Sequence, residues 1–62
     1  PLVAHRGDGG ARMDVTFYAL DAEGEWEIDH EAYAGPLNTA RAMVEEWMRG
    51  HEADRMCRIQ EA

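Results

Sequence analysis

The feature that most constrains the fold is a stretch in which every second residue is acidic. The six carboxylates of this acidic row are Asp21, Glu23, Glu25, Glu27, Asp29 and Glu31. Successive side chains of an extended strand point to opposite faces, so this spacing predicts a strand with its carboxylates on one face. Trp26, Ile28 and His30 are then expected on the other face, with Trp26 and Ile28 in the core.

Chain length limits how large that core can be. A chain of 62 residues forms one small domain, and a domain of this size buries only about 60% of the surface that it exposes when unfolded. Stability is therefore expected to be marginal, and contacts with a partner are expected to add to it. The expected core residues form one thin layer: Val15, Phe17, Trp26, Ile28, Leu37, Ala40, Val44, Trp47, Cys57 and Ile59.

The first half of the packed domain reads as a β-hairpin. Residues 13–20 alternate apolar and polar side chains and are rich in β-branched and aromatic types, which predicts a half-buried strand. Residues 21–24 end in Gly24 and have the signature of a tight turn. Residues 25–30 then form the second strand, and residues 31–35 are expected to be a connection, with Tyr33 folded over the core edge.

The second half reads as a helix followed by a short strand. Pro36 is favoured in a first helical turn, Asn38 or Thr39 can cap it, and Gly50 is a suitable stop. The apolar stripe of this helix includes Leu37, Ala40, Val44 and Trp47. Residues 55–60 alternate again and predict a third strand, with a continuation of the helix as the alternative.

Together these elements predict an α+β fold. Its three-stranded antiparallel sheet has the connectivity β-β-α-β and the order 2-1-3, with the helix packed on one face. The domain is expected to span residues 13–62, preceded by a flexible, glycine-rich arm over residues 1–12. In this order the acidic strand lies at a sheet edge, where charged side chains discourage pairing with other chains.

Composition restricts the classes of partner. A net charge of −7 argues against direct nucleic-acid binding, because affinity for phosphates comes from Lys and Arg. It favours a basic protein surface instead. No apolar run could cross a bilayer and no signal peptide is visible, so no membrane partner is expected. The single cysteine, Cys57, excludes an internal disulfide and fits a cytoplasmic location.

The acidic row itself suggests what such a partner normally binds. Alternate strand residues lie roughly 6.6 to 6.8 Å apart, close to the spacing of successive phosphates along a nucleic acid. In composition the chain resembles small acidic phage or mobile-element proteins that block defence nucleases. The sequence therefore predicts a non-catalytic protein-binding module whose row acts as a nucleic-acid mimic and inhibits a basic nucleic-acid-handling protein.

Two alternatives remain open. A homodimeric structural or regulatory module would associate through its sheet edge or its helix, where Met43, Trp47 and Met48 offer apolar contact surface. A row that is only a solvated face would serve to prevent aggregation.

Catalysis, cofactors and metals are not expected. His5, His30, His51 and Cys57 lack the paired spacings of zinc sites. Pro1 resembles the N-terminal base of small tautomerases, but the glycine-rich segment that follows departs from their pattern.

Overall fold

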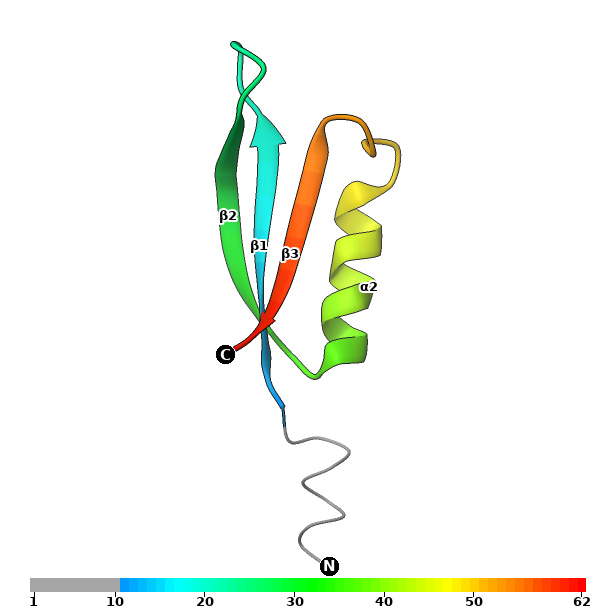
Figure 1. Ribbon diagram of the computed structural model, residues 1–62. Helices are drawn as coiled ribbons and strands as arrows, with labels where there is room; N and C mark the ends of the chain where they lie inside the picture. The colour runs from blue at the N-terminus through cyan, green and yellow to red at the C-terminus, as the bar shows by residue number, and fades with distance from the viewer. Residues whose placement is uncertain (1–10) are drawn as a thin grey trace, which may run out of the picture.

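A computed structural model describes residues 11–62 and shows the expected α+β fold. The elements are β1 (Met13–Leu20), β2 (Trp26–Gly35), α2 (Leu37–Met48) and β3 (Arg55–Glu61). Both strand pairs are antiparallel and the sheet order is β2-β1-β3. Helix α2 lies on one side of the sheet, and the hairpin tip projects away from the start of the helix (Figure 1). Within the described residues the other side of the sheet has no helix, and we call it the open face.

The structure describes only the last two residues of the predicted arm. Residues 1–10 lie outside the described part of the chain. Arg12 belongs to the end of the sheet, because its carbonyl accepts a hydrogen bond of 2.8 Å from the Ala62 backbone N–H.

Strand β1 organises the core because it is central. Its β-branched and aromatic residues suit a pleated, half-buried surface, and Val15 and Phe17 are 0% and 2% exposed. In the ladder with β3, Val15 lies opposite Ile59 and Phe17 opposite Cys57. Directly opposite residues share a face of the sheet, so all four side chains point toward α2.

Backbone groups mark both ends of helix α2. Its N-cap residue is Pro36, and no side chain caps it. The Pro36 carbonyl accepts the first hydrogen bonds, from the backbone N–H groups of Thr39 and Ala40. The prediction of a cap by Asn38 or Thr39 is therefore wrong, because both residues already lie in the first turn. Gly50 has a φ of +79°, which confirms it as the stop.

The hairpin turn is held by the side chain of Asp21. Its Oδ1 accepts hydrogen bonds from the backbone N–H groups of Glu23 and Glu25, at 2.9 and 2.8 Å. The backbone N–H of Asp21 donates to the Glu25 carbonyl at 2.8 Å, and Gly24 has a φ of +83°. This Asx-type arrangement confirms the predicted turn and gives Asp21 a structural role.

Removing that acceptor is expected to loosen the hairpin. Asp21→Ala leaves two backbone donors without their partner and should lower the free energy of unfolding by about 1–2 kcal/mol. Asp21→Asn removes the same charge but keeps an acceptor oxygen, so it should retain most of the stability. Urea denaturation followed by circular dichroism compares them. Wild-type stability of Asp21→Ala would show that the turn does not depend on the Asp21 side chain.

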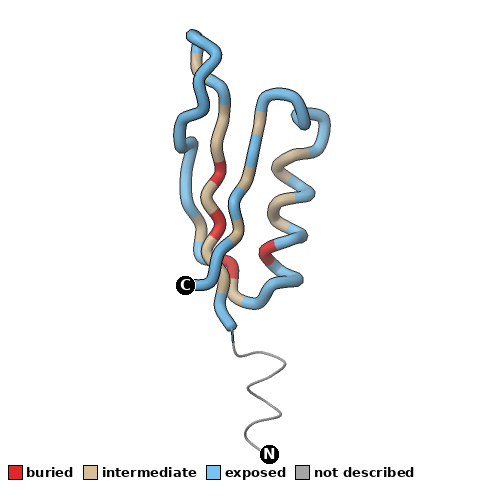
Figure 2. The backbone as a smooth tube through the Cα atoms, in the orientation of Figure 1, coloured by how far each residue is buried: buried red, intermediate tan, exposed pale blue. Residues whose placement is uncertain are grey.

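The core is thinner than the sequence predicts and is made partly of alanine. Its buried residues are Val15, Phe17, Ala34 and Ala40. The half-buried residues packed against them are Met13, Ala32, Met43, Val44, Trp47, Cys57 and Ile59. Buried segments lie in the half of the sheet away from the hairpin tip, and most of β2 is exposed (Figure 2).

Three expected core residues are exposed. Trp26 is 44% exposed, Ile28 is 55% exposed and Leu37 is 38% exposed. The expected connection over residues 31–35 is instead the second half of β2. Its Ala32 and Ala34 replace Trp26 and Ile28 as the core residues of this strand, and Tyr33 is exposed rather than folded over the core.

Candidate protein-binding face

An irregularity in β2 decides which side chains share a face. Phe17 lies opposite His30, but the next residue, Tyr18, lies opposite Ile28. Asp29 is therefore an extra residue without a partner in β1, which is a β-bulge. Because one extra residue reverses the alternation, side chains before and after Asp29 follow opposite parity.

The orientation of individual side chains agrees with this reversal. The His30 ring stacks on Phe17 with a centroid distance of 4.3 Å and lies 5.7 Å from the Trp47 ring, so His30 faces α2. Trp26 and Ile28 lie opposite Leu20 and Tyr18, which point away from the helix. The prediction that Trp26, Ile28 and His30 share the core face is wrong for the two apolar residues.

The same reversal divides the acidic row. Asp21, Glu23 and Glu25 precede β2 and belong to the turn. Glu27 lies opposite Ala19 on the helix side, whereas Glu31 lies opposite Thr16 on the open face. The prediction of six evenly spaced carboxylates on one face is therefore wrong: the row forms an acidic hairpin end that extends around both faces.

Charge is nevertheless concentrated at this end of the molecule. Residues 21–31 contain six of the 13 acidic residues and no Arg or Lys. The remaining seven acidic residues are nearly balanced by the six basic ones, so the hairpin segment carries −6 of the net −7. Within residues 11–62, the only ion pair made by a carboxylate of the acidic row joins Asp29 to His30, at 2.6 Å. An uncompensated cluster of this kind produces a strong directional field.

Next to this acidic end, the open face carries an apolar patch. Its members come from all three strands and are Tyr18, Leu20, Trp26, Ile28 and Met56. Tyr18 is central, because Ile28 lies opposite it on one side and Met56 on the other. Leu20, Trp26, Ile28 and Met56 are between 37% and 55% exposed. Contiguous exposed apolar side chains with a polar surround are typical of interaction sites.

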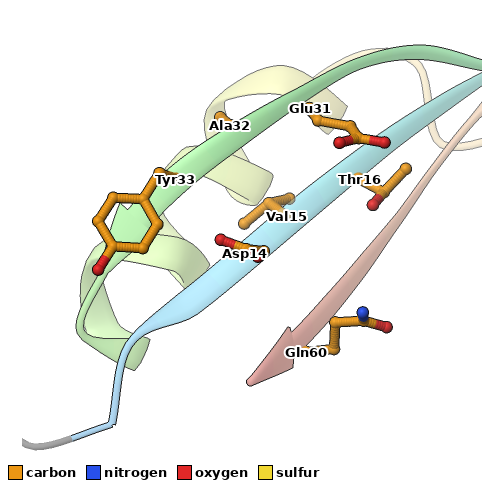
Figure 3. Close-up of a pocket in the computed structure, with 7 residues that line it drawn as sticks. All are labelled: Asp14, Val15, Thr16, Glu31, Ala32, Tyr33 and Gln60. Atoms are coloured by element: carbon orange, nitrogen blue, oxygen red, sulfur yellow. The ribbon is translucent and has the colours of Figure 1, made fainter. Parts of the chain in front are cut away.

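The other half of the open face is polar. A shallow hollow of about 310 Å³ lies there, lined by Asp14, Thr16, Glu31, Tyr33 and Gln60 among others. Figure 3 shows Glu31 of β2 beside Thr16 of β1, with Gln60 on β3. Arg12 donates a hydrogen bond to the Tyr33 hydroxyl, which raises the pKa of Arg12, and its guanidinium also lies 5.3 Å from the Tyr33 ring. This half places polar groups beside the patch.

A second depression lies on the helix side, between α2 and β2. It measures about 620 Å³ and is lined by Phe17, His30, Met43, Trp47 and Arg55 among others. Arg55 donates to the Trp47 carbonyl at 2.7 Å, and its guanidinium lies 4.5 Å from the Trp47 ring. Since these contacts tie β3 to the end of α2, Arg55 has a structural role that the sequence did not suggest.

The remaining candidates for chemistry are not brought together in the described structure: His30 pairs with Asp29 and His51 with Asp54, and Pro1 and His5 lie outside the described residues. No group of three His, Cys, Asp or Glu side chains within residues 11–62 is arranged to hold a metal ion. Burial raises the pKa of the Cys57 thiol, so this residue is a poor nucleophile near neutral pH. No helix in the described part of the chain is both long and apolar enough to span a bilayer.

The apolar patch is the part of this face that sequence reasoning missed. Trp26 and Ile28 alternate with carboxylates as core residues of an amphipathic strand would, and the bulge that reverses them has no glycine or proline to mark it. Comparisons with protein-family models, curated proteins and solved structures found no match to this chain.

Proposed function

We propose that this protein is a non-catalytic module that binds the basic surface of another protein through its acidic hairpin end. The observation that carries the proposal is the concentration of charge: residues 21–31 hold −6 of the net −7. Carboxylates that have no arginine partner within the described chain are available to Lys and Arg of a partner. Such a field steers association and orients the partner before contact.

The bulge favours protein recognition without imitation of a nucleic acid. A phosphate mimic requires evenly spaced carboxylates on one face, and the parity reversal at Asp29 interrupts that spacing. A protein partner needs no regular interval, because its Lys and Arg side chains are long and can reach carboxylates at varied positions. The proposal therefore retains the basic partner and omits the mimicry.

Neutralising the hairpin tests this role directly. The variant Glu25→Gln/Glu27→Gln/Asp29→Asn removes three charges from the acidic end. Wild-type and variant proteins are immobilised to capture partners from a lysate, and the captured protein is then purified for titration at several salt concentrations. The variant is expected to bind about tenfold to a hundredfold more weakly at low salt, because steering and charge pairing are lost.

A matched variant controls for net charge. Glu45→Gln/Glu46→Gln/Glu52→Gln removes the same number of charges from α2 and the loop after it, and it should bind as the wild type does. Equal weakening by both variants, or an affinity that does not change with salt, would show that the hairpin end is not the contact surface.

A homodimer is the second candidate, and the exposed apolar patch on the open face is the observation that favours it. Two copies could cover each other's Trp26 and Ile28. Sedimentation equilibrium over a range of protein concentrations tests this directly. A dimer that persists when Glu25, Glu27 and Asp29 are neutralised and that dissociates on Ile28→Ser would favour self-association over binding to a basic protein.

A further inference from the structure

The apolar patch and the acidic hairpin end form one continuous surface. The turn that holds Asp21, Glu23 and Glu25 directly follows Leu20 and precedes Trp26. Glu31 lies on the open face at the other end of the patch, opposite Thr16, whereas Glu27 faces the helix side. On the open face Trp26 and Ile28 meet Tyr18 and Leu20 of β1, and Met56 adjoins Tyr18 from β3. An apolar centre with a charged border is the usual anatomy of a protein interface, in which the centre supplies affinity and the border supplies orientation.

The charge of the border selects the occupant. A second copy would bring the same turn carboxylates and Glu31, and an isologous contact over this patch would set two predominantly acidic borders close together, although Arg58 of β3 also lies on this face, opposite Thr16. Anionic lipid surfaces and nucleic-acid backbones are repelled for the same reason. A protein element that has both an apolar stripe and Lys or Arg beside it is complementary to the centre and to the border.

The geometry of the sheet favours a helix over an added strand. At the β2 edge the bulge at Asp29 interrupts the regular hydrogen-bonding row that another strand would need. The open face has no such interruption across β1 and β3. Helix α2 already covers the opposite face of this sheet (Figure 1), and a helix on the open face would complete a three-layer arrangement, which is a common way to bury both faces.

We infer that the patch formed by Tyr18, Leu20, Trp26, Ile28 and Met56 is the docking surface for a basic amphipathic helix of another protein. This inference rests on the proposed function and adds the docking face and the kind of element that binds there. The apolar residues of the docking helix pack in the patch, and the Lys or Arg side chains of that helix reach the hairpin carboxylates.

The test uses three designed peptides and the full chain. The first has a leucine stripe flanked by lysines, the second has the same stripe flanked by glutamates, and the third scrambles the first so that no stripe remains. The two indole N–H signals of Trp26 and Trp47 are followed by nitrogen-15 NMR and assigned with Trp26→Phe. The first peptide should shift the Trp26 signal strongly, leave Trp47 little changed and bind more tightly than the other two.

Substitution of the patch separates this inference from the proposed function. Ile28→Ser should weaken binding of the leucine-lysine peptide about tenfold or more. Leu37→Ser, at an exposed apolar side chain of α2, should have little effect. The leucine-lysine peptide could instead bind in a salt-sensitive way without shifting the Trp26 signal and with the same affinity for Ile28→Ser. That result overturns the docking surface but leaves the proposed function standing. Equal binding of the glutamate peptide, or no peptide binding at all, overturns the docking surface for a basic helix, while the proposed function is decided separately by the salt titration of the hairpin variant. A dimer that Ile28→Ser dissociates assigns the patch to a second copy and overturns the inference.

Discussion

Replacing Phe17 with alanine is expected to remove a large part of the free energy of unfolding at 25 °C. Phe17 is 2% exposed and has the largest fully buried side chain among residues 11–62. Its ring stacks on His30 and meets the edge of Trp47 at a centroid distance of 5.0 Å, so it joins β1, β2 and α2. Such a truncation costs about 3–5 kcal/mol, and the free energy of unfolding of a domain of this size is about 3–9 kcal/mol in total. Far-UV circular dichroism and urea titration measure the loss.

The matched control is the same truncation on the open face. Ile28→Ala removes apolar atoms from a side chain that is 55% exposed, and its cost should stay below about 1 kcal/mol. The comparison also tests the register of β2. If Ile28→Ala destabilised the domain as much as Phe17→Ala, Ile28 would have to lie in the core, and the bulge at Asp29 could not be present.

Local patterns in the sequence were sufficient to predict the elements and their order. The strand over residues 13–20 and the helix that includes Ala40, Val44 and Trp47 each follow one regular period. The turn between the first two strands is marked by its residue types, from Asp21 to Gly24. Short connections and the right-handed crossover then leave few ways to assemble a hairpin, a helix and a strand. The observed order β2-β1-β3 follows from these local signals.

The faces of β2 could not be predicted in the same way. Trp26, Ile28, His30, Ala32 and Ala34 all stand at even positions, and Tyr33 is the one large apolar side chain of the strand at an odd position. The pattern alone therefore places the even-numbered residues together. The bulge at Asp29 leaves Ala32 and Ala34 on the helix side and turns Trp26 and Ile28 to the open face. No residue type in the strand marks the position of that bulge, because any L-residue can occupy it.

The division of β2 also explains why charge and apolar surface occur together at the hairpin end. The buried residues lie toward the other end of the sheet, where Ala34 and Ala40 are in contact with the core (Figure 2). The hairpin beyond Phe17 is not needed to complete that core. Its Trp26 and Ile28 therefore remain exposed, and their neighbours in the chain are carboxylates.

Helix packing depends on the small size of Ala40. This residue is 0% exposed and is the only residue of α2 that is fully buried. It belongs to the same buried cluster as Ala34 of β2 and Val15 of β1. Two alanines in that cluster leave little volume between helix and sheet, so a larger side chain at position 40 must displace the helix or adopt a strained rotamer.

Ala40→Leu is accordingly expected to lower the free energy of unfolding by about 1–3 kcal/mol, although leucine is nearly as good a helix former as alanine. Ala42→Leu provides the control, because Ala42 is an exposed residue of the same helix and the substitution is chemically identical. Its stability should remain within about 0.5 kcal/mol of the wild type. Urea denaturation gives both values. Similar stabilities for the two variants would mean that α2 packs loosely on the sheet, and that the four-residue core does not fix the distance between the two layers.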